Sequence, residues 1–490
     1  MLFNSLEFLI FFPVVAAVFF LLPHRFRGLF LLLASYYFYM CWRVEYVLVI
    51  IFLTCIDYWA GIKMADCKDS NLRRTFLIVS LGANLGLLFS FKYLSFLNES
   101  VRSVLQLLGV SYDVPYLNIL LPMGISFHTF QTMAYAIDVY RGNQKAERSF
   151  LKFALYVAFF PQLVAGPIER AGNLIPQFYK KHVLSSSNLV YGLRRIVWGF
   201  FKKVVIADRL ALLVNRIFND PQQYQGIPLI IAAVFFAFQL YCDFSAYTDI
   251  AIGSARVMGF KLKENFALPF SATSVRDFWN RWHISLSSWV KDYLYTPLFL
   301  ALRGLSPHYR LYASLMISMV LFGLWHGAGW NFIFFGFYWG VWLVLYAMLS
   351  PIFRHWLQFK NPALEGAWFG ARVIFTFIIM AVGMIFFRAN SLNDAFYIIT
   401  HLLDFSTTSQ WLEAMSIKNN TVIVMGLSKL DIVFSFGLIL FSQAFYWFQL
   451  RKGLFAVKPA VMRFTFYYIL IVLMIFLGKF DKSPFIYFQF

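Results

Sequence analysis

LFGLWHGAGWNFIFFGF, residues 321–337, is apolar enough to lie inside a membrane, yet it contains one imidazole, that of His326. Trp325 precedes this histidine, and glycines occupy positions 323, 327 and 329. The whole chain of 490 residues shares this apolar character, since 60% of its residues are hydrophobic and only 13% are charged. Soluble domains contain about 25% charged residues. The composition therefore indicates a membrane protein.

Long apolar runs recur along the whole chain, and about 20 apolar residues are needed to cross the hydrocarbon core of a bilayer. The clearest runs lie at 8–22, 29–42, 46–62, 76–91, 227–242, 311–325, 331–349, 371–387, 432–448 and 464–478. They predict an all-α polytopic membrane protein with about ten to twelve spans. We expect one integral-membrane domain, 1–490, made of N-terminal helices (1–115), a catalytic core (116–390), C-terminal helices (391–482) and an aromatic tail (483–490).

The formal net charge of +19 is concentrated in segments that we interpret as loops, such as 141–152, 179–182, 194–209 and 450–463. Cytoplasmic loops that face anionic lipid explain this charge, and some of the cations are also suited to meet an anionic cofactor. The distribution of Lys and Arg predicts that the N-terminus faces outward. Nucleic-acid binding is not expected, because no basic and aromatic face stands outside the membrane pattern. The cysteines and histidines show no metal-ligand spacing.

Two segments interrupt the regular pattern of apolar runs. Residues 159–178 contain three prolines and two glycines, which a spanning helix is not expected to have. Backbone of this kind lies at membrane depth only when it is buried in protein or lines a cavity, so we expect part of a cavity wall on the cytoplasmic side. In residues 261–297, charges alternate with aromatic side chains. This alternation predicts interfacial or re-entrant helices packed within protein.

A third irregular segment, 240–260, contains four polar side chains in an otherwise apolar tract: Asp243, Ser245, Thr248 and Asp249. Ionisable groups inside a membrane are expensive and more often functional than not. A polar contact between helices explains the pattern equally well. The sequence leaves both interpretations open.

His326 is the strongest candidate for chemistry. The glycines around it remove side-chain bulk, so that a substrate or another backbone can come close. An imidazole titrates near neutral pH and needs only a small change of environment to act as a general base. The alternative is a core histidine hydrogen-bonded to a neighbouring carbonyl group. His128, by contrast, is predicted to be structural and satisfied by polar neighbours: Ser126, Thr129 and Gln131.

Five ordered motifs carry a resemblance to a known family. They are LPMGISFHTFQTMAYAIDVYRG (121–142), FFPQLVAGPIER (159–170), DFSAYTDIAIGSARVMGF (243–260), NFALPFSATSVRDFWNRWHISLSSWVKDYLYTPL (265–298) and LWHGAGWNFIFFG (324–336). On these residues the chain resembles the membrane-bound O-acyltransferase (MBOAT) family, and within it the bacterial AlgI-like branch of alginate O-acetylases and the teichoic acid D-alanylation proteins. The resemblance implies a helical funnel of about 11–12 transmembrane helices with re-entrant or interfacial helices.

The resemblance also implies roles for particular residues. The family's invariant histidine matches His326, and a second polar position matches His283. His326 is then the general base of an acyltransferase, and His283 assists by orientation or by holding a developing oxyanion. Candidates for binding the donor are Trp325, Asn331, Trp282 and Arg281. No metal is implied.

The chain ends in SPFIYFQF, which contains Tyr487. In the D-alanylation system a small partner protein ends in a similar aromatic motif, whose tyrosine is considered to carry the acyl group. The AlgI-like branch resembles a version with that tail fused to the enzyme, so Tyr487 is a candidate acyl relay. The alternative is an aromatic belt at the membrane interface. The basic residues of 450–463 predict that the tail lies on the outer side.

These expectations combine into one function. Acetyl-CoA is the expected donor substrate, with no permanently bound cofactor, and the acetyl group would cross the bacterial cytoplasmic (inner) membrane. An extracytoplasmic partner resembling SGNH-type acetyltransferases would then O-acetylate a polysaccharide, either alginate or a similar exopolysaccharide. A peptidoglycan O-acetylation system is one alternative. A transporter of a solute or acyl donor, with the two histidines as proton relay groups, is another.

Overall fold

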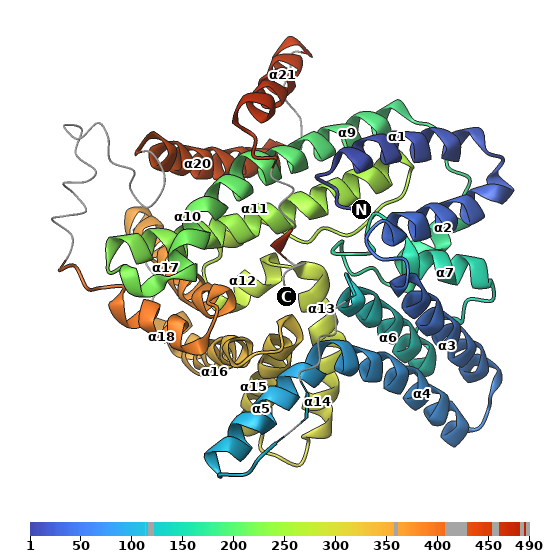
Figure 1. The fold of residues 1–490 in the computed structure, drawn as a ribbon, viewed down its shortest axis with the longest axis horizontal. Coiled ribbons are helices and arrows are strands. Elements are labelled where there is room, and N and C mark those ends of the chain that lie inside the picture. Colours follow the sequence, from blue (N-terminus) through green and yellow to red (C-terminus); the bar gives the residue numbers. More distant parts are fainter. Residues whose placement is uncertain are drawn as a thin grey trace. The chain divides into compact units, whose positions relative to one another are not determined.

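The computed structural model describes residues 1–112, 114–115, 122–356, 361–406, 429–452, 460–480 and 485–486. Over these residues the regular secondary structure is helical (Figure 1). The chain divides into two compact units, of which the first comprises 1–196 and 247–264, and the second 197–246 and 265–486. α9 and α11 each begin in one unit and end in the other. The expected subdivision of a single domain at 115 and 390 stays a prediction.

The first unit contains the N-terminal helices and most of α9. In chain order they are α1 (Leu6–Leu21), α2 (His24–Met40), α3 (Tyr46–Asp66), α4 (Ser70–Leu88), η1 (Phe89–Tyr93), α5 (Leu94–Leu107), α6 (Ile125–Arg141), α7 (Phe150–Ala158), α8 (Ala171–Phe178) and the larger part of α9 (Ser186–Phe201).

The second unit contains the larger part of α11 and the remaining elements. In chain order they are η2 (Lys202–Ala207), α10 (Asp208–Asn219), η3 (Pro221–Gln223), α11 (Ile227–Val257), η4 (Pro269–Ser271), α12 (Val275–Arg281), α13 (Ile284–Val290), η5 (Lys291–Tyr295), α14 (Thr296–Ala301), α15 (Pro307–His326), α16 (Trp330–Trp356), α17 (Pro362–Arg388), α18 (Leu392–His401), α20 (Lys429–Lys452) and α21 (Ala460–Leu477).

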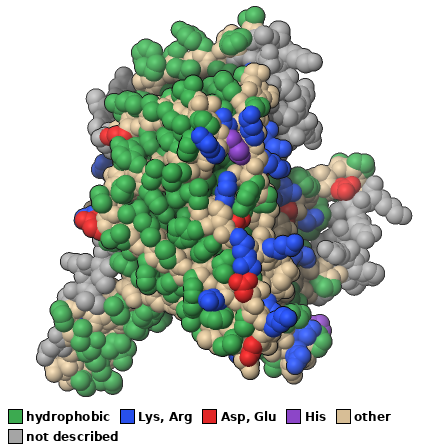
Figure 2. All heavy atoms as spheres, turned by 90° about the vertical axis from the view of Figure 1, so that its right-hand side faces the viewer, with side chains coloured by type: hydrophobic (Ala, Val, Ile, Leu, Met, Phe, Trp, Pro, Cys, Tyr) green, Lys and Arg blue, Asp and Glu red, His purple; other side chains and the backbone are tan. Residues whose placement is uncertain are grey.

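Several helices are long and apolar enough to cross a bilayer. Among the described residues five meet this condition: Tyr46–Asp66, Ser70–Leu107, Ile227–Val257, Trp330–Pro351 and Pro362–Arg388. Shorter apolar stretches lie in α1, α20 and α21, at Leu6–Leu21, Leu430–Phe445 and Phe464–Leu477. Hydrophobic side chains cover a broad area of the face in Figure 2, with Lys and Arg gathered along one side. The chain is therefore an all-α polytopic membrane protein, as predicted, and the count of 11–12 crossings stays a prediction.

A buried polar network joins α3, α4 and α6 in the first unit. The Asp57 carboxylate accepts hydrogen bonds from Ser80 Oγ at 2.5 Å and from Asn84 Nδ2 at 2.9 Å. Thr132 of α6 donates to Asn84 Oδ1 at 2.8 Å. Each polar atom has a partner on another helix, so the network fixes the rotation of the three helices relative to one another.

The proline-rich segment 159–178 is irregular from Phe159 to Arg170 and then forms α8. Its residues from Phe159 to Glu169 are buried, in agreement with the expectation that such backbone must be enclosed by protein. Gly124 at the start of α6 has φ +71°, and a Cβ there would lie 2.8 Å from the Leu163 carbonyl oxygen. Only glycine allows this approach.

The interpretation of 194–209 as a charged cytoplasmic loop was wrong. These residues belong to α9, η2 and α10, and Arg195, Lys202 and Lys203 are buried. Arg195 Nε donates to Asp249 Oδ1 at 2.7 Å, and its Nη atoms contact the Glu264 carboxylate. Partners on α11 and in the following segment neutralise the charge, which a hydropathy pattern cannot reveal.

Candidate active site

His326 is the last residue of α15, because Gly327 takes up an extended conformation and α16 begins at Trp330. The side chain is 7% exposed. Its ring centroid lies 4.6 Å from that of Phe322, 4.8 Å from Trp325, 5.2 Å from Phe387 and 5.6 Å from Phe335. Three helices, α15, α16 and α17, supply these rings. The imidazole therefore lies in a largely apolar environment with little access for water.

The glycines near His326 permit close packing of α15 on α16. A Cβ on Gly323 would lie 2.3 Å from the Phe332 carbonyl oxygen and 2.6 Å from the Gly336 nitrogen. A Cβ on Gly327 would lie 2.1 Å from the Phe332 ring. Of the two possibilities that the sequence left open, another backbone rather than a substrate occupies the space beside Gly323.

Two of the predicted donor-binding residues are close to His326 in the sequence. Trp325 precedes it on α15 and is 6% exposed. Asn331, in the first turn of α16, donates from Nδ2 to the Ala389 carbonyl oxygen at 3.1 Å. This hydrogen bond ties the start of α16 to the end of α17, so Asn331 has a structural task at the His326 pocket. A part in donor binding stays a prediction for both residues.

His283 occupies the turn between the short helices α12 and α13. Its backbone has φ +44° and ψ +55°, a left-handed conformation that non-glycine residues adopt at a cost. The side chain is 1% exposed, and its ring packs edge-on against Phe244 of α11, with centroids 4.5 Å apart. Strain of this kind persists only where surrounding contacts determine the conformation, as is common at active sites.

Asn265 supplies those contacts, and the sequence analysis missed it. Its backbone oxygen accepts from Ile284 N at 2.9 Å, and its Oδ1 accepts from Ser285 Oγ at 2.6 Å and from Ser285 N at 3.3 Å. Both residues follow His283 directly, and Asn265 is fully buried. A lone asparagine in a loop gives no periodic signal, so only the fold reveals this support.

The other two donor-binding candidates, Trp282 and Arg281, precede His283. Trp282 is 3% exposed and stacks on Phe278, with ring centroids 5.5 Å apart. Arg281 donates from Nε to Asp277 Oδ1 at 2.8 Å and from Nη1 to the Ala267 carbonyl oxygen at 3.3 Å. Arg281 thus stabilises the segment that contains His283, and its assignment to the donor stays a prediction.

A continuous series of ring contacts links the two histidines inside the second unit. From His283 it passes through Phe244, Phe266, Trp282, Phe278, Trp279 and Phe322 to His326, with successive ring centroids 4.5 to 5.5 Å apart. Helix α12 provides Phe278 and Trp279, and Trp282 follows that helix directly. From Asn265 to Trp289 the segment 261–297 is thus packed within protein, as predicted, whereas η5 (Lys291–Tyr295) has no buried residue. The aromatic side chains of the packed part separate the two imidazoles.

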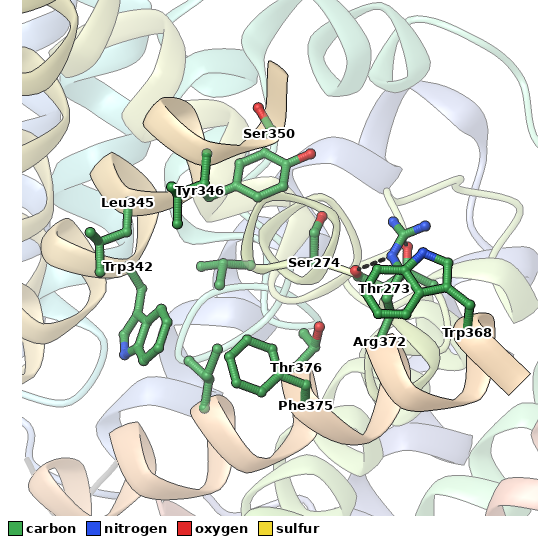
Figure 3. Close-up of a pocket in the computed structure, with 13 residues that line it drawn as sticks. Thr273, Ser274, Trp342, Leu345, Tyr346, Ser350, Trp368, Arg372, Phe375 and Thr376 are labelled. Atoms are coloured by element: carbon green, nitrogen blue, oxygen red, sulfur yellow. Dashed lines mark hydrogen bonds between the residues drawn. The ribbon is translucent and has the colours of Figure 1, made fainter. Parts of the chain in front are cut away.

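A cavity of about 480 Å³ lies between α16 and α17, and neither histidine lines it. Its walls include Trp342, Leu345, Tyr346, Phe375 and Thr376, with Thr273 and Ser274 before α12 (Figure 3). Arg372 borders it and donates to the backbone oxygen of Thr273 at 3.2 Å. Eight residues, about 12 Å of helix, separate the lining residue Ile379 from Phe387 beside His326.

The prediction that polar neighbours satisfy His128 was wrong. Thr129 Oγ1 donates to the Ile125 carbonyl oxygen, and Gln131 Nε2 donates to the Tyr156 carbonyl oxygen. Within the part of the chain that the structure describes, neither ring nitrogen of the buried His128 has a hydrogen-bond partner. Its neighbours are engaged by the α6 and α7 backbones, so they do not turn toward the imidazole.

The candidate relay Tyr487 lies outside the described residues, but the two residues before it are described. Phe485 and Ile486 are 1% and 5% exposed.

Three polar residues of the segment 240–260 contact η2 and α9. Asp243 pairs with Lys203, Ser245 accepts a hydrogen bond from Lys202, and Asp249 pairs with Arg195. These contacts between helices agree with the second of the two interpretations that the sequence left open for this segment, that of polar contacts between helices.

Comparison with known proteins identifies the family. The model of MBOAT, the membrane-bound O-acyltransferase family, matches residues 146–387, which include both histidines. The "Probable alginate O-acetylase AlgI" of Pseudomonas putida is 38% identical over 81% of this chain and 79% of its own length. That of Pseudomonas aeruginosa is 37% identical over 83% and 76%. The "Peptidoglycan O-acetyltransferase" of Helicobacter pylori is 34% identical over 78% and 75%. The chain therefore belongs to the membrane-bound O-acyltransferase family.

Proposed function

We propose that this protein takes an acetyl group from cytoplasmic acetyl-CoA and passes it across the bacterial cytoplasmic membrane for O-acetylation of an extracytoplasmic polysaccharide. The observation that carries the proposal is the placement of His326 at the end of α15, enclosed by four aromatic rings. A general base in so apolar a pocket is protected from water that would hydrolyse a thioester. Relatives named alginate O-acetylase support acetyl as the group transferred.

The first step is transfer of acetyl from the thioester to a hydroxyl, for which the Tyr487 phenol is our candidate. His326 removes the phenol proton while the oxygen attacks the thioester carbonyl carbon. The C–S bond then breaks, and the leaving thiolate takes the proton back from the imidazolium. The products are an O-acetyl tyrosine and free CoA, and His326 is neutral again.

His283 has two possible tasks in this step, both consistent with its rigid turn. The clamp by Asn265 fixes the backbone at His283 before substrate arrives, which favours orientation of the reacting groups or stabilisation of the tetrahedral oxyanion. A preorganised group costs no rearrangement during the reaction. His283 is therefore assigned the supporting role and His326 that of base.

In the second step an SGNH-type extracytoplasmic partner takes over the acetyl group. A hydroxyl of that partner attacks the tyrosyl ester, and the tyrosine phenol is released. The partner then acetylates the polysaccharide, so the membrane protein need not bind the glycan. We favour alginate or a similar exopolysaccharide, and the relative named peptidoglycan O-acetyltransferase makes peptidoglycan the second candidate. Membership of an acyltransferase family decides against the transporter alternative.

The test uses purified protein in lipid nanodiscs with isotopically labelled acetyl-CoA. Mass spectrometry of the C-terminal peptide is expected to find label on Tyr487 in the wild type and none in His326→Ala or Tyr487→Phe. Free CoA is expected to appear in equal amount. Label on a different side chain would overturn the relay, and absence of any protein-bound label with intact acetyl-CoA would overturn the proposed transfer.

A further inference from the structure

A buried charge cluster lies between η2, α10 and α11 in the second unit. Lys203 Nζ is 2.7 Å from Asp243 Oδ1 and 2.9 Å from Asp208 Oδ1. The three side chains are 1%, 2% and 8% exposed. Lys203 belongs to a π-helical stretch, a local irregularity that is frequent at functional sites. We call these three residues the Lys203 cluster.

The cluster binds the C-terminal segment of the same chain. The backbone N–H of Ile486 donates to Asp243 Oδ2 at 2.8 Å, across 243 residues of sequence. The Lys203 ammonium lies 4.5 Å from the ring centroid of Phe485, a cation–π distance. Asp243 thus uses one oxygen for Lys203 and the other for the tail. The cluster thus recognises this segment through the backbone amide of Ile486 and the aromatic ring of Phe485.

The beginning of the C-terminal segment is held by the same region. Lys479 N donates to the Val204 carbonyl oxygen at 2.9 Å, and Val204 directly follows Lys203. Arg209 Nη2 donates to the Leu477 carbonyl oxygen at 3.1 Å. Contacts at 477, 479, 485 and 486 therefore all converge on η2, α10 and one turn of α11.

This turn of α11 also forms a wall of the His283 site. Asp243 holds Ile486, and the next residue, Phe244, packs edge-on against the His283 ring at 4.5 Å. Tyr487 follows Ile486 directly in the sequence. The anchor of the tail and the packing of His283 thus depend on adjacent residues of one helix.

We propose that the Lys203 cluster is a receptor for residues 485–486 of the C-terminal segment, and that Lys203 and Asp243 are positioning residues for acetyl transfer to that segment. The docking rests on the contacts above, and its consequence for acetyl transfer rests on the proposed function. An internal receptor explains why ionic side chains are kept in the protein interior, where apolar ones would be less costly. It predicts that the tail remains bound when no substrate is present.

The test measures hydrogen–deuterium exchange of the C-terminal peptide in nanodiscs. In the wild type we expect at least one amide, that of Ile486, to exchange more than tenfold more slowly than in the free synthetic peptide SPFIYFQF. The variant Lys203→Met/Asp243→Leu is made together with Asp208→Asn, so that no buried carboxylate of the cluster loses its cation. It replaces the buried pair by apolar side chains of similar size, which such sites often tolerate. It should exchange its tail at the free-peptide rate while peptides from α15 and α16 are unchanged.

The matched control is Asp249→Asn, which alters another buried acidic residue of α11 that pairs with Arg195. It should keep the tail protected. Two results would overturn the proposal that the cluster binds the tail. One is equal protection of the tail from exchange in the wild type and the Lys203→Met/Asp243→Leu variant, and the other is an unprotected tail in the wild type.

Labelled acetyl-CoA separates this proposal from the relay. We expect at least a tenfold loss of label on Tyr487 in the Lys203→Met/Asp243→Leu variant. Full labelling in that variant would overturn the positioning role and leave the relay intact. Protected tails without label on Tyr487, even in the wild type, would support the receptor and overturn the relay.

Discussion

Substitution of Gly323 by alanine should displace His326 without touching any titratable group. The new Cβ would lie 2.3 Å from the Phe332 carbonyl oxygen, whereas ordinary contacts begin at 3.4 Å. The obstacle is backbone of α16, which no rotamer change can move, so α15 and α16 must separate by about 1 Å at this point. His326 lies three residues further along α15. A misplacement of about 1 Å costs on the order of 100-fold in rate.

The assay is release of CoA and labelling of Tyr487, together with the thermal unfolding midpoint of the same preparation. We expect a rate loss of about 100-fold and a stability loss of about 1–3 kcal/mol from overpacking. Gly370→Ala in α17 is the control, since a Cβ there meets no atom within 4 Å, and it should gain about 0.5–1 kcal/mol. A Gly323→Ala enzyme within twofold of the wild-type rate would refute the idea that this helix contact sets the position of the base.

Two further substitutions remove buried contacts that became visible only in the fold, one at the His283 turn and one at Asp249. Asn265→Ala leaves the buried N–H and O–H groups of Ser285 without their acceptor, so we expect a loss of about 1–3 kcal/mol and a lower acetyl-transfer rate. The measurements are thermal unfolding and CoA release, and an unchanged rate would contradict the role given to the His283 turn. Arg195→Ala leaves Asp249 buried without its cation and should cost about 3 kcal/mol in thermal unfolding. Arg148→Ala, which breaks an ion pair whose two side chains are 62% and 53% exposed, should leave the unfolding midpoint unchanged; equal effects of the two arginine substitutions would contradict this account.

The two histidines show what sequence motifs could and could not predict about the candidate site. The sequence identified His326 and His283 as candidates from the WHG and RWHISLSSW motifs. The structure puts both in the second unit and gives each an aromatic environment. The sequence did not show that the glycines near His326 allow α15 to pack on α16. A glycine in a sequence indicates free space beside the backbone, but it does not indicate whether a ligand or another helix fills that space.

Charged residues show the limit of the pattern more clearly. The sequence pattern predicts a basic loop at Arg195, Lys202 and Lys203, since local hydropathy records only how polar a segment is. Their partners Ser245, Asp243 and Asp249 are 40 to 54 residues away in sequence. A charge at membrane depth is tolerated only when its partner is in place, and that depends on how the helices pack.

The membrane class, the helical secondary structure and the segments where ordinary spanning helices are impossible all follow from the order of the amino acids. These properties are local, because apolar length, proline and glycine act on the residues beside them. The packed fold was needed to show which charges are buried as pairs, that Asn265 supports the His283 turn, and that Ile486 donates a hydrogen bond to Asp243. Such contacts join residues far apart in the chain, and their energies exist only when packing brings the groups within hydrogen-bond distance.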